Sequence, residues 1–177
     1  MKFHSTPLEG VTVVELEPRN DERGSFARAF CLREMSAAGL AMQVAQVNLS
    51  CSTRRGTLRG MHFQLPPFAE AKLVRCVRGS VYDLCLDVRA DSPTFGQSWG
   101  VDLTDGNRLA VYLPKGIAHG YLTLSDNCEV LYLTDEFYSS QWERRIRWND
   151  PRFELIWPFE PLVISERDSS HPDYEVT

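Results

Sequence analysis

The sequence lacks several features that would assign a protein to a class at once. Its 177 residues contain no CxxC pair, so neither a zinc knuckle nor a disulfide framework is indicated. No stretch approaches the roughly 20 apolar residues that a membrane span needs, and the first residues lack the apolar run of a signal peptide. We therefore expect a soluble, cytoplasmic protein without a membrane partner. Most of its five cysteines are predicted to be small buried residues: Cys31, Cys51, Cys76, Cys85 and Cys128.

Positive charge is also scarce. Lys and Arg total 19 against 24 Asp and Glu, and the net charge of −5 gives no support to a nucleic-acid partner. A small anionic ligand held by local cations remains compatible with this balance. The chain has no GxGxxG fingerprint to hold a dinucleotide cofactor. With 43% hydrophobic residues, a chain of this length is expected to build one well-buried core, so residues 1–177 are predicted to form one domain.

Helical periodicity is rare, whereas short runs with alternating apolar and polar residues recur along the chain. Such runs, separated by Gly, Pro, Asn and Asp, predict an all-β protein, a double-sheet jelly roll with a few short helices. Short helical segments are predicted at Leu32–Ala38 and Ser140–Arg144, and an irregular C-terminal segment from about Trp157. The predicted strands are Val11–Glu17, Ala45–Ser52, Leu58–Gln64, Lys72–Val77, Val81–Arg89, Ser98–Leu103, Arg108–Leu113, His119–Thr123 and Glu129–Thr134.

Two histidines occur in places where chemistry is plausible. His62 lies in the short strand LRGMHFQ, and His119 follows the turn KGIAHG. Strict alternation along the first strand would direct Gly60, His62 and Gln64 to one face, and Arg59, Met61 and Phe63 to the other. Gly60 lets a ligand or another backbone approach closely. This stretch alone favours a ligand-facing histidine and a hydrogen-bonded core histidine about equally.

The surroundings of both histidines resemble the two sequence motifs of the cupin barrels. Gly56 precedes His62 at the spacing of the first motif, and Pro114-Lys115-Gly116 precedes His119 as in the second. Metal-binding cupins carry a further histidine two residues after the first, where this chain has Gln64. Because a neutral amide is a poor ligand for transition metals, we expect a barrel without a metal.

A longer series of blocks is more specific. The blocks are DERGSFARAF, QVNLS, TLRGMHFQLPP, AKLVRCVRG, DVRADSPTFG, LPKGIAHGY, EVLYLTDEFY, IRWNDPRF and ISERD, in this order. They resemble the dTDP-4-dehydrorhamnose 3,5-epimerase family from about Gly10 to Asp168. The resemblance implies a cupin-like jelly roll that epimerises a nucleotide-diphosphate sugar without a cofactor. It also implies a homodimer in which N-terminal strands cross to the partner.

The same resemblance implies the catalytic residues. It makes His62 the base, with Asp168 as the carboxylate partner of its imidazole, and Tyr132 the acid on the opposite face of the sugar. It places the Lys72 ammonium at the 4-keto oxygen, where a cation favours the enolate over the ketone. These groups would remove a proton from C3, C5 or both carbons of a 4-keto-6-deoxyhexose, most simply dTDP-4-dehydro-6-deoxyglucose, and return it on the other face.

The residues that the resemblance assigns to substrate binding would each look like surface residues if taken singly. Arg28 departs from the family, which usually has glutamate at this place near the nucleotide, so CDP- and GDP-linked sugars are also considered. Arg167 replaces a common lysine and keeps its charge. Arg23 matches the arginine that reaches across the dimer, and Tyr138 the aromatic residue that stacks on the base. The remaining predicted binding residues are Gln46, Asn48, Arg59, His119 and Glu143.

Two other functions are compatible with a barrel of this kind. A cupin 3,4-ketoisomerase would act on similar substrates, but the RGMHFQ and EVLY blocks favour the epimerases. A non-catalytic cupin that binds sugar nucleotides is disfavoured because His62, Lys72, Tyr132 and Asp168 are all present. The residues do not distinguish a rhamnose pathway from an antibiotic-sugar or polysaccharide pathway.

Overall fold

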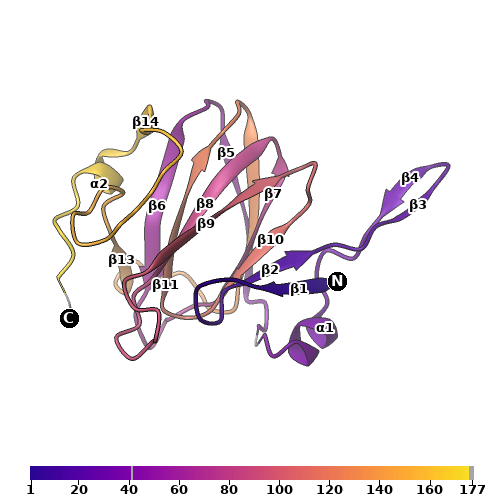
Figure 1. The fold of residues 1–177 in the computed structure, drawn as a ribbon, viewed down its shortest axis with the longest axis horizontal. Helices are drawn as coiled ribbons and strands as arrows, with labels where there is room; N and C mark the ends of the chain where they lie inside the picture. The colour runs from indigo at the N-terminus through magenta and orange to yellow at the C-terminus, as the bar shows by residue number, and fades with distance from the viewer. Residues whose placement is uncertain (41, 176–177) are drawn as a thin grey trace.

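Two antiparallel β-sheets pack against each other and form an open barrel (Figure 1). The computed structural model describes residues 1–40 and 42–175. The first sheet has the order β1 (Lys2–Ser5), β2 (Thr12–Glu15), β10 (Ala110–Leu113), β7 (Lys72–Arg78), β12 (Cys128–Thr134) and β5 (Gln46–Ser52). The second has the order β13 (Glu143–Arg145), β6 (Thr57–Gln64), β11 (Ile117–Thr123), β8 (Ser80–Asp87) and β9 (Ser98–Thr104). A two-residue strand, β14 (Val163–Ile164), adds to β6 in parallel. The predicted double-sheet β architecture is confirmed.

The main core lies between the two sheets. Alternate side chains of the central strands point inward, as the period-two pattern requires. Val74 of β7 and Val130 of β12 belong to the same buried cluster as Val81 and Cys85 of β8 and Leu103 of β9. Cys76, Cys85 and Cys128 are buried as predicted, whereas Cys51 is exposed, and all five cysteines are free thiols. Val74, Tyr121 and Val130 of this core also line a cavity between the two sheets.

Each sheet also has an outer face that other segments cover. The helix α1 (Leu32–Ala37) places Met35 on the first sheet, where it packs in a cluster with Leu73 and Tyr112. The C-terminal segment covers the second sheet with Ile146 and Phe153, which cluster with inner-strand residues such as Met61. This segment contains the one-turn helix α2 (Glu166–Ser169), which lies beside β6 (Figure 1).

The nine predicted strands are all present, with ends that differ by a few residues. The strand predicted from Arg108 begins only at Ala110, because Arg108 has a φ of 54°, outside the extended region. The predicted helical segment at Ser140–Arg144 is wrong. The chain makes a single turn, in which the Glu143 N–H donates to the Ser139 carbonyl at 2.9 Å, and then forms β13 against β6. Pairing with the sheet outweighs the local capping signal of the serines.

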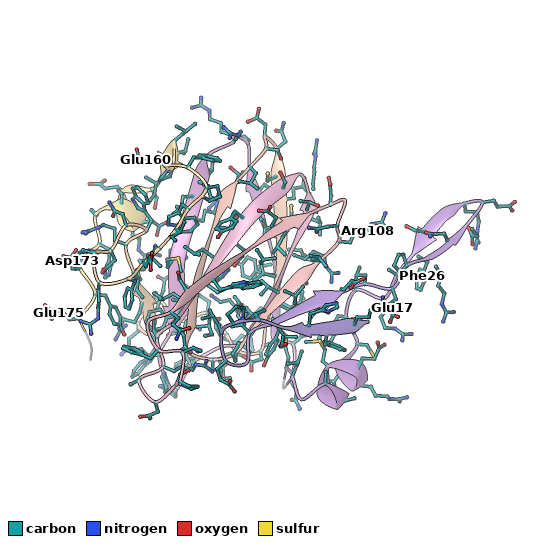
Figure 2. All side chains as sticks on the ribbon, viewed as in Figure 1. Glu17, Phe26, Arg108, Glu160, Asp173 and Glu175 are labelled. Carbon is teal, nitrogen blue, oxygen red and sulfur yellow. The ribbon has the colours of Figure 1, made fainter. Side chains whose placement is uncertain are left out.

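The strands before residue 30 include a hairpin that the sequence did not predict. Its strands β3 (Arg19–Asp21) and β4 (Gly24–Phe26) extend away from the barrel (Figure 1). Phe26 is 73% exposed on this arm, and Figure 2 shows it at the base of the hairpin. Strands β1 and β2 pair with each other, and β2 pairs with β10 of the same chain. Within the described residues, no helix is long and apolar enough to cross a membrane.

Candidate active site

A β-bulge in β6 sets the geometry of the site. His62 pairs with His119 of β11 and Arg59 pairs with Tyr121, so Gly60 and Met61 together oppose Gly120 alone. Gly60 has a φ of 125°, and a Cβ there would lie 2.4 Å from the Gly120 Cα. The glycine therefore admits a neighbouring backbone rather than a ligand.

Because of the bulge, the side chains of β6 do not alternate as predicted. The extra residue lets Arg59 and His62 line the same cavity, so the prediction that they face opposite sides of the strand is wrong. Met61 and Phe63 are buried on the other side of β6, as predicted. Strict period-two reasoning fails here because one inserted residue shifts every side chain before it to the other face.

Side chains from both sheets line a cavity of about 420 Å³ at the open end of the barrel. His62 and His119 enter it from the second sheet, and Lys72 and Tyr132 enter it from the first. An adjoining cavity of about 510 Å³ shares His62, Lys72 and Tyr132. The three groups thus lie at the junction of the two cavities, so a ligand that extends through both passes them.

His62 and Asp168 form the central contact of the site. The His62 Nε2 lies 2.7 Å from the Asp168 Oδ1, and the Asp168 side chain is only 7% exposed. Ser165 caps α2 by accepting the Asp168 N–H at 3.1 Å, and β14, which pairs with β6, leads into this turn. The predicted pairing of these two side chains is present. Local sequence patterns could not predict this contact, because the two residues are 106 positions apart.

Burial and neighbouring charges shift the pKa of both partners. Burial is the largest influence on His62 and lowers its pKa, with help from the charges of Arg145 and Lys72 and against the effect of Asp168. Burial works to raise the pKa of Asp168, but the hydrogen bond and charge of His62 and the charge of Arg145 outweigh it, so this pKa is lowered. The pair is thus set for a neutral imidazole beside a carboxylate, which is the state a general base requires.

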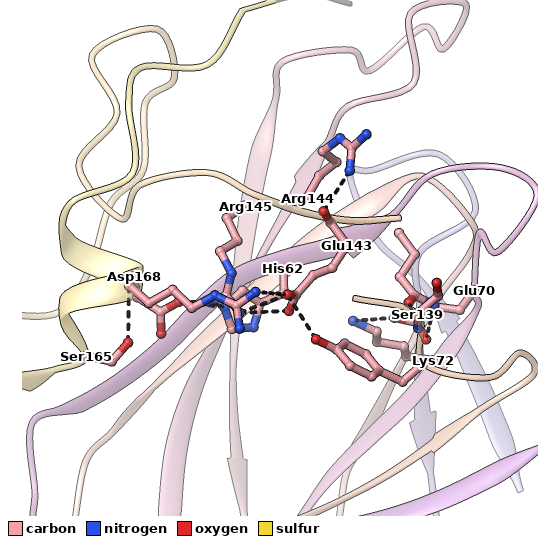
Figure 3. A network of polar contacts seen from close by, with 12 residues as sticks. His62, Glu70, Lys72, Ser139, Glu143, Arg144, Arg145, Ser165 and Asp168 are labelled. Atoms are coloured by element: carbon pink, nitrogen blue, oxygen red, sulfur yellow. Dashed lines mark hydrogen bonds and ion pairs between the residues drawn. The ribbon is translucent and has the colours of Figure 1, made fainter. Parts of the chain in front are cut away.

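Arg145 of β13 joins this pair and was missed by the sequence analysis. Its Nη1 contacts both the Asp168 Oδ1 and, at 2.8 Å, the His62 Nε2. Its Nη2 donates to the two carboxylate oxygens of Glu143 at 2.9 and 3.0 Å. Figure 3 shows the guanidinium between Asp168 and Glu143, next to the imidazole. The only signal was the second arginine of the run ERR, which looks like a solvated charge cluster.

Tyr132 and Lys72 contribute the other half of the site. Burial is the main cause that raises the pKa of the Tyr132 hydroxyl, so this group stays protonated and able to donate a proton. The Lys72 side chain is 9% exposed, and its Nζ lies 3.1 Å from the Glu70 Oε1. A strand-end lysine would be expected in solvent, whereas this one is buried and points to the same cavity as His62. Glu70, the partner of Lys72, was not predicted.

His119 has its own buried carboxylate. Its Nδ1 lies 3.3 Å from the Asp83 Oδ2, and Asp83 is completely buried in β8. This carboxylate orients the ring and holds the proton on Nδ1, which leaves Nε2 for a ligand. A signal for Asp83 was present, because an acidic residue stands among apolar neighbours in the strand SVYDLCLD.

The adjoining cavity contains four of the predicted binding residues: Gln46, Asn48, Tyr138 and Glu143. The Tyr138 hydroxyl donates to the Glu143 Oε2 at 3.2 Å, and the Tyr138 N–H donates to the Gln46 Oε1 at 2.9 Å. Glu143 also accepts a bond of 2.8 Å from the Arg167 Nη2, so it connects the two cavities. These contacts hold the walls in place before any ligand binds.

The cavity walls are rich in cations, which suits an anionic ligand. Arg59, Lys72, Arg145 and Arg167 all line the first cavity. The Arg59 guanidinium is steered by Ser52, whose Oγ accepts from its Nε at 3.3 Å. Across the described residues, no three His, Cys, Asp or Glu side chains gather in a way that could hold a metal ion. Guanidinium groups bind phosphate oxygens through paired hydrogen bonds, so a diphosphate fits this lining.

Two predicted binding residues lie elsewhere. Arg23 is at the tip of the hairpin, where its side chain pairs with Asp21 at 2.5 Å. Arg28 follows the hairpin and pairs with Glu34 at 2.9 Å. Neither residue lines the cavities around His62, because the hairpin extends away from the barrel. A single chain therefore does not bring these two arginines to the site.

Comparisons with known proteins agree with the motifs and the fold. The family model described as dTDP-4-dehydrorhamnose 3,5-epimerase matches residues 5–175. A dTDP-4-dehydrorhamnose 3,5-epimerase of Mycobacterium tuberculosis is 44% identical over an alignment of 180 positions, gaps included. The alignment covers 99% of this chain and 88% of the relative. The crystal structure of such an epimerase from Bacillus anthracis, with TDP and PPi bound, superposes with a TM-score of 0.94 at 34% identity and covers 98% of this chain and 99% of that one.

A further solved structure contains a sugar nucleotide. The Legionella pneumophila dTDP-6-deoxy-D-glucose-3,5-epimerase, in complex with dTDP-4-keto-L-rhamnose, superposes with a TM-score of 0.88 at 33% identity and covers 94% of this chain and 89% of that one. Both the family match and the relatives extend over nearly the whole chain. The chain therefore belongs to the dTDP-4-dehydrorhamnose 3,5-epimerase family of sugar-nucleotide epimerases.

Proposed function

We propose that this protein inverts C3, C5 or both carbons of a dTDP-linked 4-keto-6-deoxyhexose through an enolate. One observation carries the proposal: His62 of the second sheet, paired with Asp168 of α2, lines the same cavity as Tyr132 and Lys72 of the first sheet. A ring held between the sheets would present one face to the imidazole and the other to the phenol. The Legionella relative, which is solved with dTDP-4-keto-L-rhamnose, supports the choice of ligand.

His62 is the proposed base. Its Nε2 is engaged by Asp168, so Nδ1 accepts the proton from the carbon next to the ketone. The electron pair of the broken C–H bond moves into the ring and onto the 4-keto oxygen, which becomes an enolate. Asp168 stabilises the imidazolium that forms, as the aspartate does in hydrolytic triads.

Lys72 and Tyr132 complete the inversion. The Lys72 ammonium faces the enolate oxygen and stabilises the negative charge that develops there, which lowers the barrier more than it strengthens ground-state binding. Tyr132 donates its phenolic proton to the same carbon from the opposite face, and the ketone re-forms. Proton exchange with solvent then returns the His62 imidazolium and the Tyr132 phenolate to their starting states.

The nucleotide would bind along the two cavities. The proposed contacts of the diphosphate are Arg59, Arg167 and the free Nε2 of His119, all of which line the first cavity. Tyr138 lies in the adjoining cavity, 55% exposed, with a ring available for stacking on the base. Gln46 and Asn48, in the same cavity, offer amide groups for hydrogen bonds to the ligand.

We also propose a homodimer, which would complete the site. The outer face of the first sheet exposes Val47 and Leu49 of β5 by 59% and 56%. Leu49 pairs with Leu131, and Leu131 pairs with Arg75, whose buried Nε and Nη2 have no partner among the described residues. An apolar patch beside a buried, unsatisfied guanidinium is typical of a surface that is covered in the assembled protein.

The hairpin β3–β4 suits the same assembly. It extends from the barrel with an exposed Phe26 and with Arg23 at its tip (Figure 1). A second copy of the chain would accept this arm, so that Arg23 and Arg28 of one protomer approach the nucleotide in the site of its partner. The proposed site then takes residues from both chains.

A cytoplasmic location fits the free thiols. All five cysteines are unpaired, including Cys51, which is exposed on the single chain. Unpaired surface thiols persist in reducing compartments.

Solvent isotope exchange tests the proposed reaction. The protein is incubated in heavy water with dTDP-4-keto-6-deoxyglucose, and with its CDP and GDP counterparts, and deuterium at C3 and C5 is followed by NMR. We expect deuterium at one or both carbons with the dTDP sugar. A carbonyl that moves from C4 to C3 would instead indicate a ketoisomerase. If no sugar nucleotide gained deuterium or rearranged, the protein would be a sugar-nucleotide-binding protein and not an enzyme.

A further inference from the structure

Arg145 contacts the proposed base and two carboxylates of the site, and the proposed function gives this residue no role. It lies 12% exposed in β13, and the pairing of Arg145 with His62 in the neighbouring strand brings the two side chains together. Its guanidinium bonds two carboxylates at once, Asp168 through Nη1 and Glu143 through Nη2. Both carboxylates belong to the candidate site, one at the base and one at the boundary of the two cavities.

The contact of Arg145 with His62 has a specific electrostatic consequence. The Arg145 Nη1 and the Asp168 Oδ1 lie 2.8 and 2.7 Å from the same His62 Nε2. One ring nitrogen cannot donate to the carboxylate and accept from the guanidinium at the same time. When Nε2 carries its proton and points to Asp168, the guanidinium faces an N–H dipole, and it faces a full positive charge once the ring is protonated. The position of Arg145 therefore opposes the imidazolium.

We propose that Arg145 is a positioning residue that holds the Asp168 carboxylate against His62 and keeps the imidazole unprotonated until substrate binds. This proposal rests on the proposed function of His62 as the base. It assigns Arg145 no contact with the substrate. The residue acts through His62 and Asp168, whose protonation and placement it controls.

Other groups act on the same imidazole. Besides Arg145 and Asp168, the charged or titratable side chains that line its cavity come from β6, β7, β11, β12 and α2: Arg59, Lys72, His119, Tyr121, Tyr132 and Arg167. Glu70, Tyr138 and Glu143 line the adjoining cavity, which His62 also borders. Lys72 acts in the same direction as Arg145, because its charge lowers the pKa of His62 as well. A test must therefore change Arg145 alone and leave these groups in place.

The neighbouring Arg144 provides a matched control. Adjacent residues of a strand point to opposite faces, and the Arg144 guanidinium donates to the carbonyls of Gln141 and Glu143 rather than to the His62 pair. Figure 3 shows Arg144 directed away from His62. Arg144→Met removes one positive charge from the same strand without touching the base, so it separates a local effect from a change in net charge.

The experiment measures the pKa of His62 in the protein without substrate. Ring carbons of isotope-labelled histidine are followed by NMR as a function of pH, and the His62 signal is assigned from its loss in His62→Asn. We expect an upward shift of this pKa in Arg145→Gln, which keeps hydrogen-bonding groups but removes the charge. Arg145→Lys keeps the charge and should give a pKa close to that of the unchanged protein, as should Arg144→Met. An unchanged or lowered pKa of His62 in Arg145→Gln would overturn the proposal.

The pH dependence of the reaction gives a second readout. If the base must be unprotonated, a higher pKa moves the acid limb of kcat/KM to higher pH in Arg145→Gln but not in Arg144→Met. A purely structural role would lower kcat/KM equally at every pH and would contradict the proposal. Because the NMR titration needs no substrate, absence of epimerisation in the unchanged protein would reject the proposed function while leaving the result on Arg145 intact.

Discussion

His62 and Tyr132 reach the same two cavities from opposite sheets of the barrel. His62 lies in β6, just beyond the bulge, and Tyr132 lies in β12, which pairs with β5 and β7. Burial lowers the pKa of the first and raises the pKa of the second. The environment thus separates an acceptor of protons from a donor of protons, which is the arrangement that inversion of a carbon centre requires.

Asp168→Asn should slow the reaction and change its pH profile. Loss of the carboxylate removes support for the imidazolium, so kcat should fall by about 10²–10⁴. The hydrogen bond and charge of Asp168 oppose the lowering of the His62 pKa, so their removal lowers this pKa further. The base then stays unprotonated to lower pH, and the acid limb of kcat/KM should move down. An acid limb that moves up, or an unchanged kcat, would contradict this role of Asp168.

Lys72→Met should remove the charge that stabilises the enolate. Loss of one such group is expected to lower kcat by about 10²–10³, with little change in the affinity for the nucleotide. The variant removes the positive charge beside Glu70, which keeps only its bond from Gln64, so Lys72→Met combined with Glu70→Gln separates the catalytic loss from a loss of stability. Lys115→Met is the matched control, because Lys115 is 53% exposed and pairs with Asp135 outside the two cavities. Turnover of Lys72→Met at the wild-type rate would exclude the proposed role.

Leu49→Asp should disrupt the proposed homodimer. The exposed apolar face around Leu49 would receive a charge that an interface cannot solvate, so the particle mass should fall from about twice the 20.2 kDa chain to the chain mass. Ile156→Asp is the control, since Ile156 is also largely exposed but lies in the C-terminal segment. Light scattering after size-exclusion chromatography measures both masses. A monomeric wild-type protein would reject the dimer.

Complementation tests whether Arg23 acts in the site of the partner. Arg23→Ala and His62→Ala are each expected to be poorly active as homodimers. After subunit exchange in an equal mixture, half of the dimers combine both chains and contain one intact site, so roughly a quarter of wild-type activity should return. If Arg23 acted within its own chain, mixing would restore nothing beyond the residual activity of Arg23→Ala.

Gly60→Ala should destabilise the protein through the bulge. A Cβ at this position would lie 2.4 Å from the Gly120 Cα, at a φ of 125° that other residues rarely adopt. We expect the free energy of unfolding to fall by at least about 2 kcal/mol, measured by denaturant titration. At Gly106 an added Cβ would meet only the Thr104 Oγ1 at 3.6 Å, so Gly106→Ala should be nearly neutral. Equal stability of the two variants would mean that β6 can shift away from Gly120.

The fold was largely predictable from sequence because most strands show a local alternation of apolar and polar residues. The central strands, such as β7 and β12, pack on both faces or alternate clearly, and all were predicted. The strand β13 was missed because its three residues, two of them arginines, carry no alternating apolar pattern, and its pairing with β6 is a long-range effect. The hairpin β3–β4 is polar and exposed, so no burial pattern marks it.

The site was predictable only in part. Family resemblance identified His62, Lys72, Tyr132 and Asp168, which the fold brings to one cavity. Local reasoning alone misplaced Arg59, since a bulge cannot be seen in the alternation of one strand. It also missed Arg145, since ionic contacts between distant segments leave no trace in local sequence. The predicted roles of Arg23 and Arg28 depend on the proposed homodimer, in which the hairpin would reach the site of the partner chain.

The most direct test of the account compares His62→Ala with Tyr132→Phe in heavy water. NMR reports deuterium incorporation at C3 and C5 of the dTDP-linked 4-keto sugar separately from inversion of each centre. We expect His62→Ala to lose exchange at both carbons. Tyr132→Phe should retain part of the exchange while inversion slows, because the enolate still forms and is reprotonated from the original face. Exchange in His62→Ala, or equal loss of exchange and inversion in Tyr132→Phe, would contradict the assignment of the base and the acid to opposite faces of one ring.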